Sequence, residues 1–507
     1  MLCKRVLVFA TLVCFIVGTH GCYTSRSITV QHLKEKPKFK ILRIVTTANE
    51  VYEFPDGGQF IENMIVGYTA EGESVKIPIE QVSVIYVREF GPTTTGKVIL
   101  GVVLVAALVG IVVAIIALDR ALDAAASSSC PFIYAFDGKG YVLDGEPYGG
   151  AVCQGLQRTD YCHMDYLKPV DGEYRILLAN ELDEIQYTDE FKLLIADHSR
   201  DVIVYQDANG DIYTIGDAQK PLHVRDADGD DYYQLLSVED YLLWASYIDH
   251  SEINVSGNLR DTLFISFPKP REVEKAKFVV SGCNTFWGSH MLRQMVCLFG
   301  DQVATWYEEM MTPRWQQMIE EWNDQVELYQ LQVYIWEDGG WKHQGEIMGG
   351  GPFVSETRVV PLDLTHVEGD SVMIRLTPPS GFWQFNMFAI DYSKDLPIQV
   401  QEVSATRATA HDGRDICDKL ERSDTDYYVM PETGQQAVLV FPVPELRPDF
   451  ERTVFAKVSG YYDLKIDTDE PSQCEQIYRI LTEPDYAVIF SNSEYQKILS
   501  QYVSTQK

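Results

Sequence analysis

The sequence predicts a mainly β protein with one membrane-spanning helix, and three observations support this fold class. Short runs of alternating apolar and polar residues, separated by turn residues, recur over most of the 507 positions. One stretch, residues 98–118, has no charged side chain. The apolar fraction of 46%, with 12% aromatic residues, is enough to build large packed cores. We therefore expect a small SH3-like or Sm-like barrel, one transmembrane helix, and a large jelly-roll-like β-sandwich region with an α-helical insertion.

Residues 1–21 have the features of a secretory signal peptide. Lys4 and Arg5 precede an apolar run, and a short polar segment ends at Gly21. Cys22 follows directly, an arrangement that resembles the bacterial lipobox, although Thr19 stands where leucine is usual. The resemblance implies cleavage before Cys22 and acylation of its thiol, which would make membrane lipid a partner. The alternative is an ordinary signal peptide that ends beside a cysteine.

Residues 22–95 are expected to form the small β-barrel domain. Their strand-like segments are short and β-branched, and we expect turns at Pro55–Gly58 and at residues 70–72. Such a domain serves as a docking module or as a spacer between the lipidated end and the helix.

Residues 96–120 contain the expected transmembrane helix, followed by a linker over residues 121–129. At about 1.5 Å per residue, the apolar stretch reaches roughly 30 Å, the thickness of the hydrocarbon core of a bilayer. Ala106, Gly110 and Ala114 are four residues apart and give one helix face a small-residue stripe that suits a helix-mediated oligomer. The alternative is a helix buried in a protein core.

Three β-rich regions are expected after the linker. Residues 130–260 alternate in the manner of strands, and residues 398–507 do so until two terminal helices. Residues 261–397 are expected to form the jelly-roll-like sandwich. Within it, apolar residues recur three and four apart over residues 286–327, which predicts the helical insertion.

Two resemblances bear on this layout. The strands at residues 334–336, 358–364, 373–376 and 388–392 resemble those of galactose-binding-like jelly-roll modules, which implies a fold more than a ligand. The whole chain resembles a group of uncharacterised bacterial envelope lipoproteins through three shared features. These are Cys22-Tyr23-Thr24, the apolar helix, and the opening Ser129-Cys130-Pro131-Phe132 of the β-rich part. This resemblance implies a cell-envelope location, and it does not imply any enzymatic activity.

The net charge of −32 argues against nucleic-acid binding, because the phosphate backbone is itself anionic. Most of the excess negative charge follows residue 119. Arg88 and Lys97 precede the expected helix, whereas Arg120 and Lys139 follow it, so the positive-inside rule leaves the side of residues 119–507 open.

Two sets of residues are candidate sites. Asp226, Asp228 and Asp230 have the alternate spacing of a calcium loop, although the glycine and the glutamate of an EF-hand are misplaced, and a solvated acidic turn is the alternative. Trp336, Trp341 and Trp383 could stack on sugar rings, the alternative being core packing. No cofactor is expected beyond structural calcium. The sequence contains no GxSxG, HExxH or P-loop motif.

We therefore expect a non-catalytic, membrane-anchored envelope lipoprotein that is structural or binds a glycan or an envelope protein. The abundant carboxylates keep a carbohydrate-active hydrolase open as an alternative. A subunit of a membrane complex, assembled through the small-residue stripe, is the other alternative.

Overall fold

The computed structural model divides the chain into two compact units, Met1–Asp119 and Arg120–Lys507. The expected signal peptide, Cys22, the apolar stretch 98–118 and the linker lie outside the residues that it describes. Among those that it does describe, no helix is both long and apolar enough to span a bilayer. The described residues are 24–28, 33, 40–47, 51–61, 63–69, 74–89, 131–240, 242–246, 248 and 259–505.

The N-terminal unit is an antiparallel sheet with a 3₁₀ turn, η1 (Ile79–Gln81), before its last strand. The expected turn at Pro55–Gly58 is wrong, because this segment is an irregularity inside the long strand β3, with Gly57 at a positive φ of 84°. Gly67 faces the ring of Phe54 so closely that a Cβ would lie 2.3 Å from it. The strands pair in the order β1 (Thr24–Ile28), β6 (Val82–Glu89), β2 (Lys40–Thr46), β3 (Val51–Ile61), β4 (Met64–Tyr68) and β5 (Ser74–Pro78).

The first sandwich of the C-terminal unit is built from both ends of that unit. Its two sheets share one core, in which the ring centroid of Phe191 in one sheet lies 6.0 Å from that of Phe441 in the other. One sheet has the order β24 (Arg407–Ala410), β26 (Gln436–Pro442), β10 (Glu173–Ala179), β7 (Phe132–Phe136) and β8 (Tyr141–Gly145). The other has the order β23 (Gln399–Ser404), β11 (Glu184–Ser199), β27 (Phe450–Leu464) and β9 (Arg158–His163), with β25 (Tyr428–Met430) also paired to β11. Regions 130–260 and 398–507, which the sequence analysis separates, therefore share sheets.

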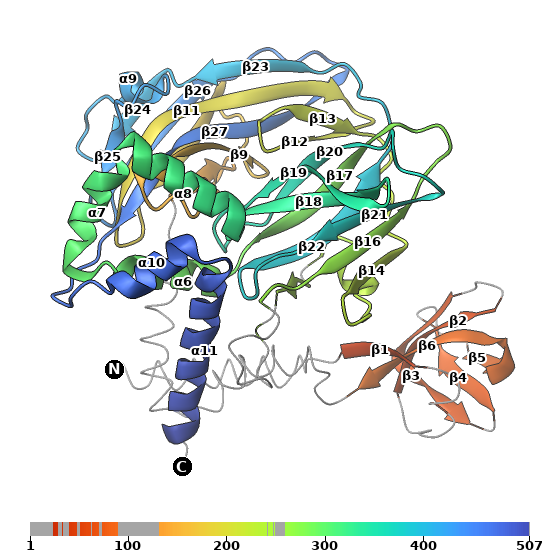
Figure 1. The fold of residues 1–507 in the computed structure, drawn as a ribbon. Coiled ribbons are helices and arrows are strands. Elements are labelled where there is room, and N and C mark those ends of the chain that lie inside the picture. Colours follow the sequence, from red (N-terminus) through yellow and green to blue (C-terminus); the bar gives the residue numbers. More distant parts are fainter. Residues whose placement is uncertain are drawn as a thin grey trace, which may run out of the picture. The chain divides into compact units, whose positions relative to one another are not determined.

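The second sandwich lies between these halves in the sequence (Figure 1). Phe267 and Phe278 meet across its core, with their ring centroids 6.2 Å apart. A five-stranded sheet has the order β14 (His223–Asp226), β16 (Leu263–Pro268), β21 (Ser371–Leu376), β18 (Gln330–Glu337) and β19 (Gly340–Met348). The facing sheet has the order β15 (Trp244–Ala245), β22 (Trp383–Asp391), β17 (Lys275–Asn284) and β20 (Glu356–Asp363). A separate hairpin pairs β12 (Ile203–Gln206) with β13 (Ile212–Ile215).

The region expected as a helical insertion is helical. Thr285 caps its first helix by accepting a hydrogen bond from Gly288 N at 2.9 Å, and Pro313 occupies the first turn of α8, where its missing N–H costs nothing. Trp322 donates its indole N–H to the carbonyl of Ile480, which fastens the C-terminal helices to the insertion. The longer helices are α6 (Phe286–Cys297), α7 (Val303–Met310), α8 (Pro313–Val326), α10 (Cys474–Thr482) and α11 (Tyr486–Thr505). The shorter ones are α5 (Tyr233–Leu236), α9 (Cys417–Leu420), η2 (Gln154–Leu156) and η3 (Gly300–Gln302).

Arg158 holds the two sandwiches against each other. Its Nη2 donates to the carbonyls of Gly149 in the first sandwich and Gly349 in the second, at 2.7 and 2.8 Å. The guanidinium also binds Asp160, with Nε 2.9 Å from Oδ1. The glycine loops approach so closely that a Cβ on Gly149 would lie 2.6 Å from the backbone of Gly350. This backbone contact therefore requires glycine at position 149.

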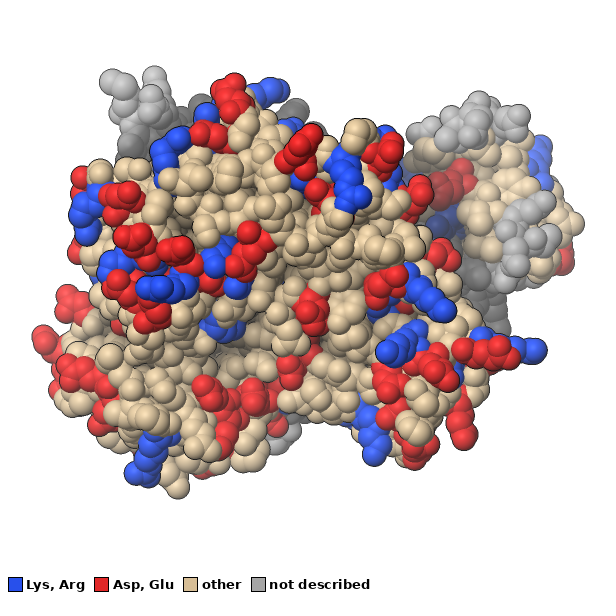
Figure 2. All heavy atoms as spheres, turned by 90° about the horizontal axis from the view of Figure 1, so that it is seen from above, with Lys and Arg blue, Asp and Glu red and all other residues tan. Residues whose placement is uncertain are grey.

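Several basic side chains of this unit lie beside carboxylates. Lys192 Nζ lies 2.6 Å from Glu402 and Lys457 Nζ 2.9 Å from Glu190, and Arg452 binds both oxygens of Asp197. On the face shown in Figure 2, acidic and basic side chains are correspondingly interspersed.

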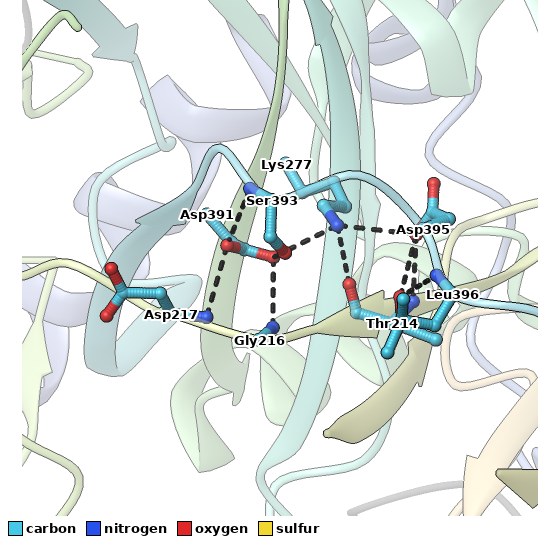
Figure 3. A network of polar contacts seen from close by, with 8 residues as sticks. All are labelled: Thr214, Gly216, Asp217, Lys277, Asp391, Ser393, Asp395 and Leu396. Carbon is cyan, nitrogen blue, oxygen red and sulfur yellow. Dashed lines mark hydrogen bonds and ion pairs between the residues drawn. The ribbon is translucent and has the colours of Figure 1, made fainter. Parts of the chain in front are cut away.

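A buried ion pair ties the β12–β13 hairpin to the second sandwich (Figure 3). Lys277 Nζ lies 3.0 Å from Asp391 Oδ2 and donates to the carbonyl of Thr214 at 2.5 Å. Asp391 also accepts hydrogen bonds from Ser393 and from the backbone N–H of Gly216. Burial alone would raise the pKa of Asp391, but these hydrogen bonds and Lys277 together hold it below its ordinary value. Each charge is thus satisfied at the end of the hairpin.

Replacing Lys277 with methionine should destabilise the C-terminal unit by about 3 kcal/mol, because Asp391 would keep a buried charge without its cation. Thermal or urea unfolding of the full-length protein measures the change. Lys419→Met is the matched control, since Lys419 pairs with Asp426 at the surface and should contribute about 1 kcal/mol or less. Equal effects of the two substitutions would contradict this account.

Three buried carboxyl groups have pKa values raised by burial: Asp144 to about 7, Glu184 to about 8 and Asp463 to about 7. Glu184 Oε2 is buried without a hydrogen-bond partner among the described residues. In the unfolded chain these carboxyl groups have pKa values of about 4. Between pH 4 and the raised pKa values, the folded state therefore binds more protons than the unfolded state. The free energy of unfolding should therefore fall as the pH rises through that window.

The melting temperature should accordingly fall between about pH 5 and about pH 8, and Glu184→Gln should make that fall shallower because glutamine cannot ionise. Differential scanning calorimetry across this range measures both slopes. Glu308→Gln, at an exposed position of α7, is the control and should leave the slope as it is. A Glu184→Gln profile parallel to that of the native protein would refute the assignment.

Candidate binding site

The outer surface of the five-stranded sheet of the second sandwich carries the candidate site. Side chains alternate along each strand, so the burial of Ile335 and Ile374 between the sheets places Tyr334 and Arg375 on the opposite face. The same alternation buries Ile265 and turns Phe264 outward. The site is thus produced by the packing of the sandwich core.

Strand register brings these outward side chains into one row across the sheet. Arg375 of β21 is opposite Phe264 of β16 on one side and Tyr334 of β18 on the other. Tyr334 is in turn opposite His343 of β19, and Arg225 of β14 is opposite Phe264. Five neighbouring strands therefore each contribute one side chain to the row, which we call the aromatic–arginine row.

Arg375 is held between two aromatic rings. Its Cζ lies 4.8 Å from the centroid of the Tyr334 ring and 4.8 Å from that of the Trp341 ring. Cation–π attraction on both faces fixes the plane of the guanidinium. Its Nε is buried with no hydrogen-bond partner in the part of the chain that the structure describes. The group is therefore oriented by stacking alone.

Two tryptophans extend the row toward the solvent. Trp336 of β18 is 44% exposed and meets Trp341 of β19 edge to face, with ring centroids 5.3 Å apart. Trp341 also lies 5.8 Å from the ring of Phe264. An exposed indole at the rim of a flat aromatic surface is the arrangement that suits stacking against an apolar ring face of a ligand.

A polar groove of about 500 Å³ adjoins the row at the level of Gln332 and Thr377. Arg260 crosses it and binds two carboxylates, Asp485 at 2.8 Å and Glu327 at 3.5 Å. Burial raises the pKa of Glu327, and Arg260 opposes that rise. The groove supplies hydrogen-bonding groups beside the aromatic surface, and Arg260, Glu327 and Asp485 within it are paired with one another.

The prediction that Trp383 contacts a ligand is wrong. Its side chain is completely buried between the sheets, it stacks on Phe385, and its indole N–H donates to the carbonyl of Glu327 at 3.0 Å. Trp383 begins β22 in the facing sheet, where inward alternation places it in the core. Of the three predicted tryptophans, the structure brings together only Trp336 and Trp341.

The aspartate loop after β14 is closed by its own hydrogen bonds. Asp226 Oδ1 accepts from the backbone N–H of Asp228 and of Asp230, at 3.0 and 2.9 Å, and Oδ2 accepts from the hydroxyl of Tyr232. Across the described residues, no group of three or more His, Cys, Asp or Glu side chains is placed to hold a metal ion. The loop is thus a hydrogen-bonded turn, and calcium plays no part in the proposals below.

The sequence analysis missed Arg375, Tyr334 and Phe264. A signal was present, because each lies between two apolar residues in a strand, in the segments Leu263–Ile265, Val333–Ile335 and Ile374–Leu376. Such a polar or aromatic residue between buried neighbours must lie on the outer face of a sheet. Which of these outward residues become neighbours depends on strand order, which no local pattern contains.

No protein-family model matches this sequence, and none of the curated proteins matches it. Among solved structures, a GH31 alpha-xylosidase from Xanthomonas citri aligns at 10% identity over 86% of this chain and 32% of its own, with a TM-score of 0.16. The chain thus spans about a third of that enzyme. A structure of Sulfolobus Turreted Icosahedral Virus aligns at 8% identity over 61% of this chain and 91% of its own, with a TM-score of 0.13. At these TM-scores, neither similarity supports an inference about fold or function.

Proposed function

We propose that this protein is a non-catalytic envelope lipoprotein that binds glycans on the outer face of the five-stranded sheet. The observation that carries the proposal is the exposed Trp336 beside Trp341, at the edge of the aromatic–arginine row. Indole faces pack against the C–H faces of sugar rings, and neighbouring hydrogen-bonding groups orient the hydroxyls. His343 and Gln332 provide such groups on adjacent positions of the sheet.

The anchoring part of the proposal is supported by the sequence. Acylation at Cys22 and a helix over residues 98–118 would give two attachments to the membrane, which together are effectively permanent. The strand order of the N-terminal unit and the 3₁₀ turn before β6 support an SH3-like barrel between these attachments. The two facing antiparallel sheets formed by residues 223–391 support a jelly-roll-like module as the glycan-binding part.

A carbohydrate-active hydrolase is the second candidate. In its favour, burial raises the pKa of Glu327, and the carboxylate of Asp485 lies in the same groove. Such a pair could act as acid and base in glycoside hydrolysis. Both carboxylates bind Arg260, however, so neither is directed toward a substrate. We therefore favour binding without turnover. Assembly of a membrane complex through Ala106, Gly110 and Ala114 rests on the sequence alone and is compatible with either function.

Glycan binding should be lost selectively when Trp336 is replaced with alanine. We expect the affinity of the full-length protein in detergent for its best-bound oligosaccharide to fall about tenfold or more, because one stacking surface is removed. Isothermal titration calorimetry against a panel of neutral and acidic oligosaccharides measures it. Phe286→Ala, another exposed aromatic, is the control that should bind normally. Absence of binding to every glycan would refute the proposal, and release of reducing ends would favour the hydrolase.

Membrane attachment should depend in part on Cys22. A Cys22→Ser variant should fail to incorporate an alkyne-labelled fatty acid, since the thiol is the acylated group. It should nevertheless stay in the membrane pellet through residues 98–118. Cys474→Ser, at an exposed cysteine in the C-terminal unit, should label as the native protein does. Recovery of the native protein from cells without detergent would contradict both attachments.

A further inference from the structure

We propose that the glycan bound on this sheet carries a carboxylate, as uronic acids do, and that Arg375 binds that carboxylate through its two terminal nitrogens. This inference rests on the proposed glycan-binding function and makes it more specific. It names the ligand class and one specificity-determining residue.

Arg375 is a cation whose hydrogen-bonding edge is unused. Arg158, Arg260 and Arg452 each bind a carboxylate and backbone carbonyls. Arg375, by contrast, has no hydrogen bond or ion pair within the described part of the chain. It lies beside the rings of Tyr334 and Trp341 and interacts electrostatically with Glu327. Its Nε is buried and has no hydrogen-bond partner among the described residues. Nη1 and Nη2 are not buried in this way, so they reach the surface. This edge is the part of arginine that binds a carboxylate with two parallel hydrogen bonds.

The rings of Tyr334 and Trp341 hold the guanidinium in place before any ligand arrives. Since its plane is fixed on both faces, little side-chain freedom is lost when a carboxylate binds. Glu327, a carboxylate whose charge interacts with Arg375, already pairs with Arg260 and accepts the backbone N–H of Gln332 at 3.1 Å. The protein's own acidic groups therefore leave this edge open.

A second arginine lies in the same row as Arg375. Arg225 is exposed in the same row, on the other side of Phe264, and forms no ion pair with a described residue. Arg225 and Arg375 are thus two cations, each without an ion pair to a described residue, in the same row. Trp341 touches both Trp336 and Arg375, so one glycan chain can stack on the indole and present a carboxylate to the guanidinium.

Three acidic oligosaccharides, each paired with its neutral methyl ester, test the inference on the full-length protein in detergent. Oligogalacturonate, oligomannuronate and oligoglucuronate keep their sugar rings on esterification and lose only the charge. We expect at least one acid to bind about tenfold more tightly than its ester in calorimetry at low salt. Arg375→Gln should remove the preference for that acid, so that the variant binds the acid and its ester with about equal affinity. Arg375→Lys should keep only part of the preference for the acid, because an ammonium cannot form two parallel hydrogen bonds with a carboxylate.

Arg447→Gln is the matched control, since Arg447 also stacks on a ring, that of Phe450 at 4.8 Å, outside this sheet. It should not change acid binding. If every acid binds no better than its ester while Trp336→Ala weakens both, the carboxylate inference is overturned and glycan binding stands. If no oligosaccharide binds, the proposed function itself fails. The comparison of acid with ester needs only the native protein, so poor folding of a variant leaves the test decisive.

Discussion

Burial of one face of every strand is the constraint on which the rest of the C-terminal unit depends. In the second sandwich, Val333, Ile335 and Ile374 are completely buried against Phe385 and Phe388 of the facing sheet. A shift of one residue in any of these strands would place its apolar set in water, so the register is strongly specified. The same register turns the intervening side chains outward and assembles the aromatic–arginine row. The candidate site is thus the outer face of a well-determined core.

Buried charges and surface charges of this sandwich have different kinds of partner. Lys277 and Asp391 are buried, and each is surrounded by several hydrogen-bonding partners, because an uncompensated charge in the interior would cost several kcal/mol. Arg375, on the outer face, is satisfied by aromatic rings and not by a carboxylate. A protein with many excess acidic groups could easily have provided a counter-ion there. The place of Arg375 beside two aromatic rings on an outward sheet face is the reason for proposing that it binds a ligand.

The second sandwich interrupts the first in sequence, and the two meet at a polar contact. The chain leaves the first sandwich after β11, builds the β12–β13 hairpin and the whole second sandwich, and returns with β23. Arg158 then joins the loops of Gly149 and Gly349, which approach at backbone distance. Because strands from both ends of the unit share sheets, neither half can bury its apolar face without the other. The two ends of this unit therefore form one sandwich, which three consecutive domains would not do.

The sequence by itself determined the mainly β character and the helical region after Thr285, because these follow from local periodicity and turn chemistry. It also carries the whole argument for Cys22 and residues 98–118. Only the tertiary structure decided that Trp383 is core, that residues 55–58 continue a strand, and that regions far apart in the chain form one sandwich. The reason is that strand order and sheet pairing are long-range choices: whether an alternating segment faces core or solvent depends on neighbours that its own residues do not specify.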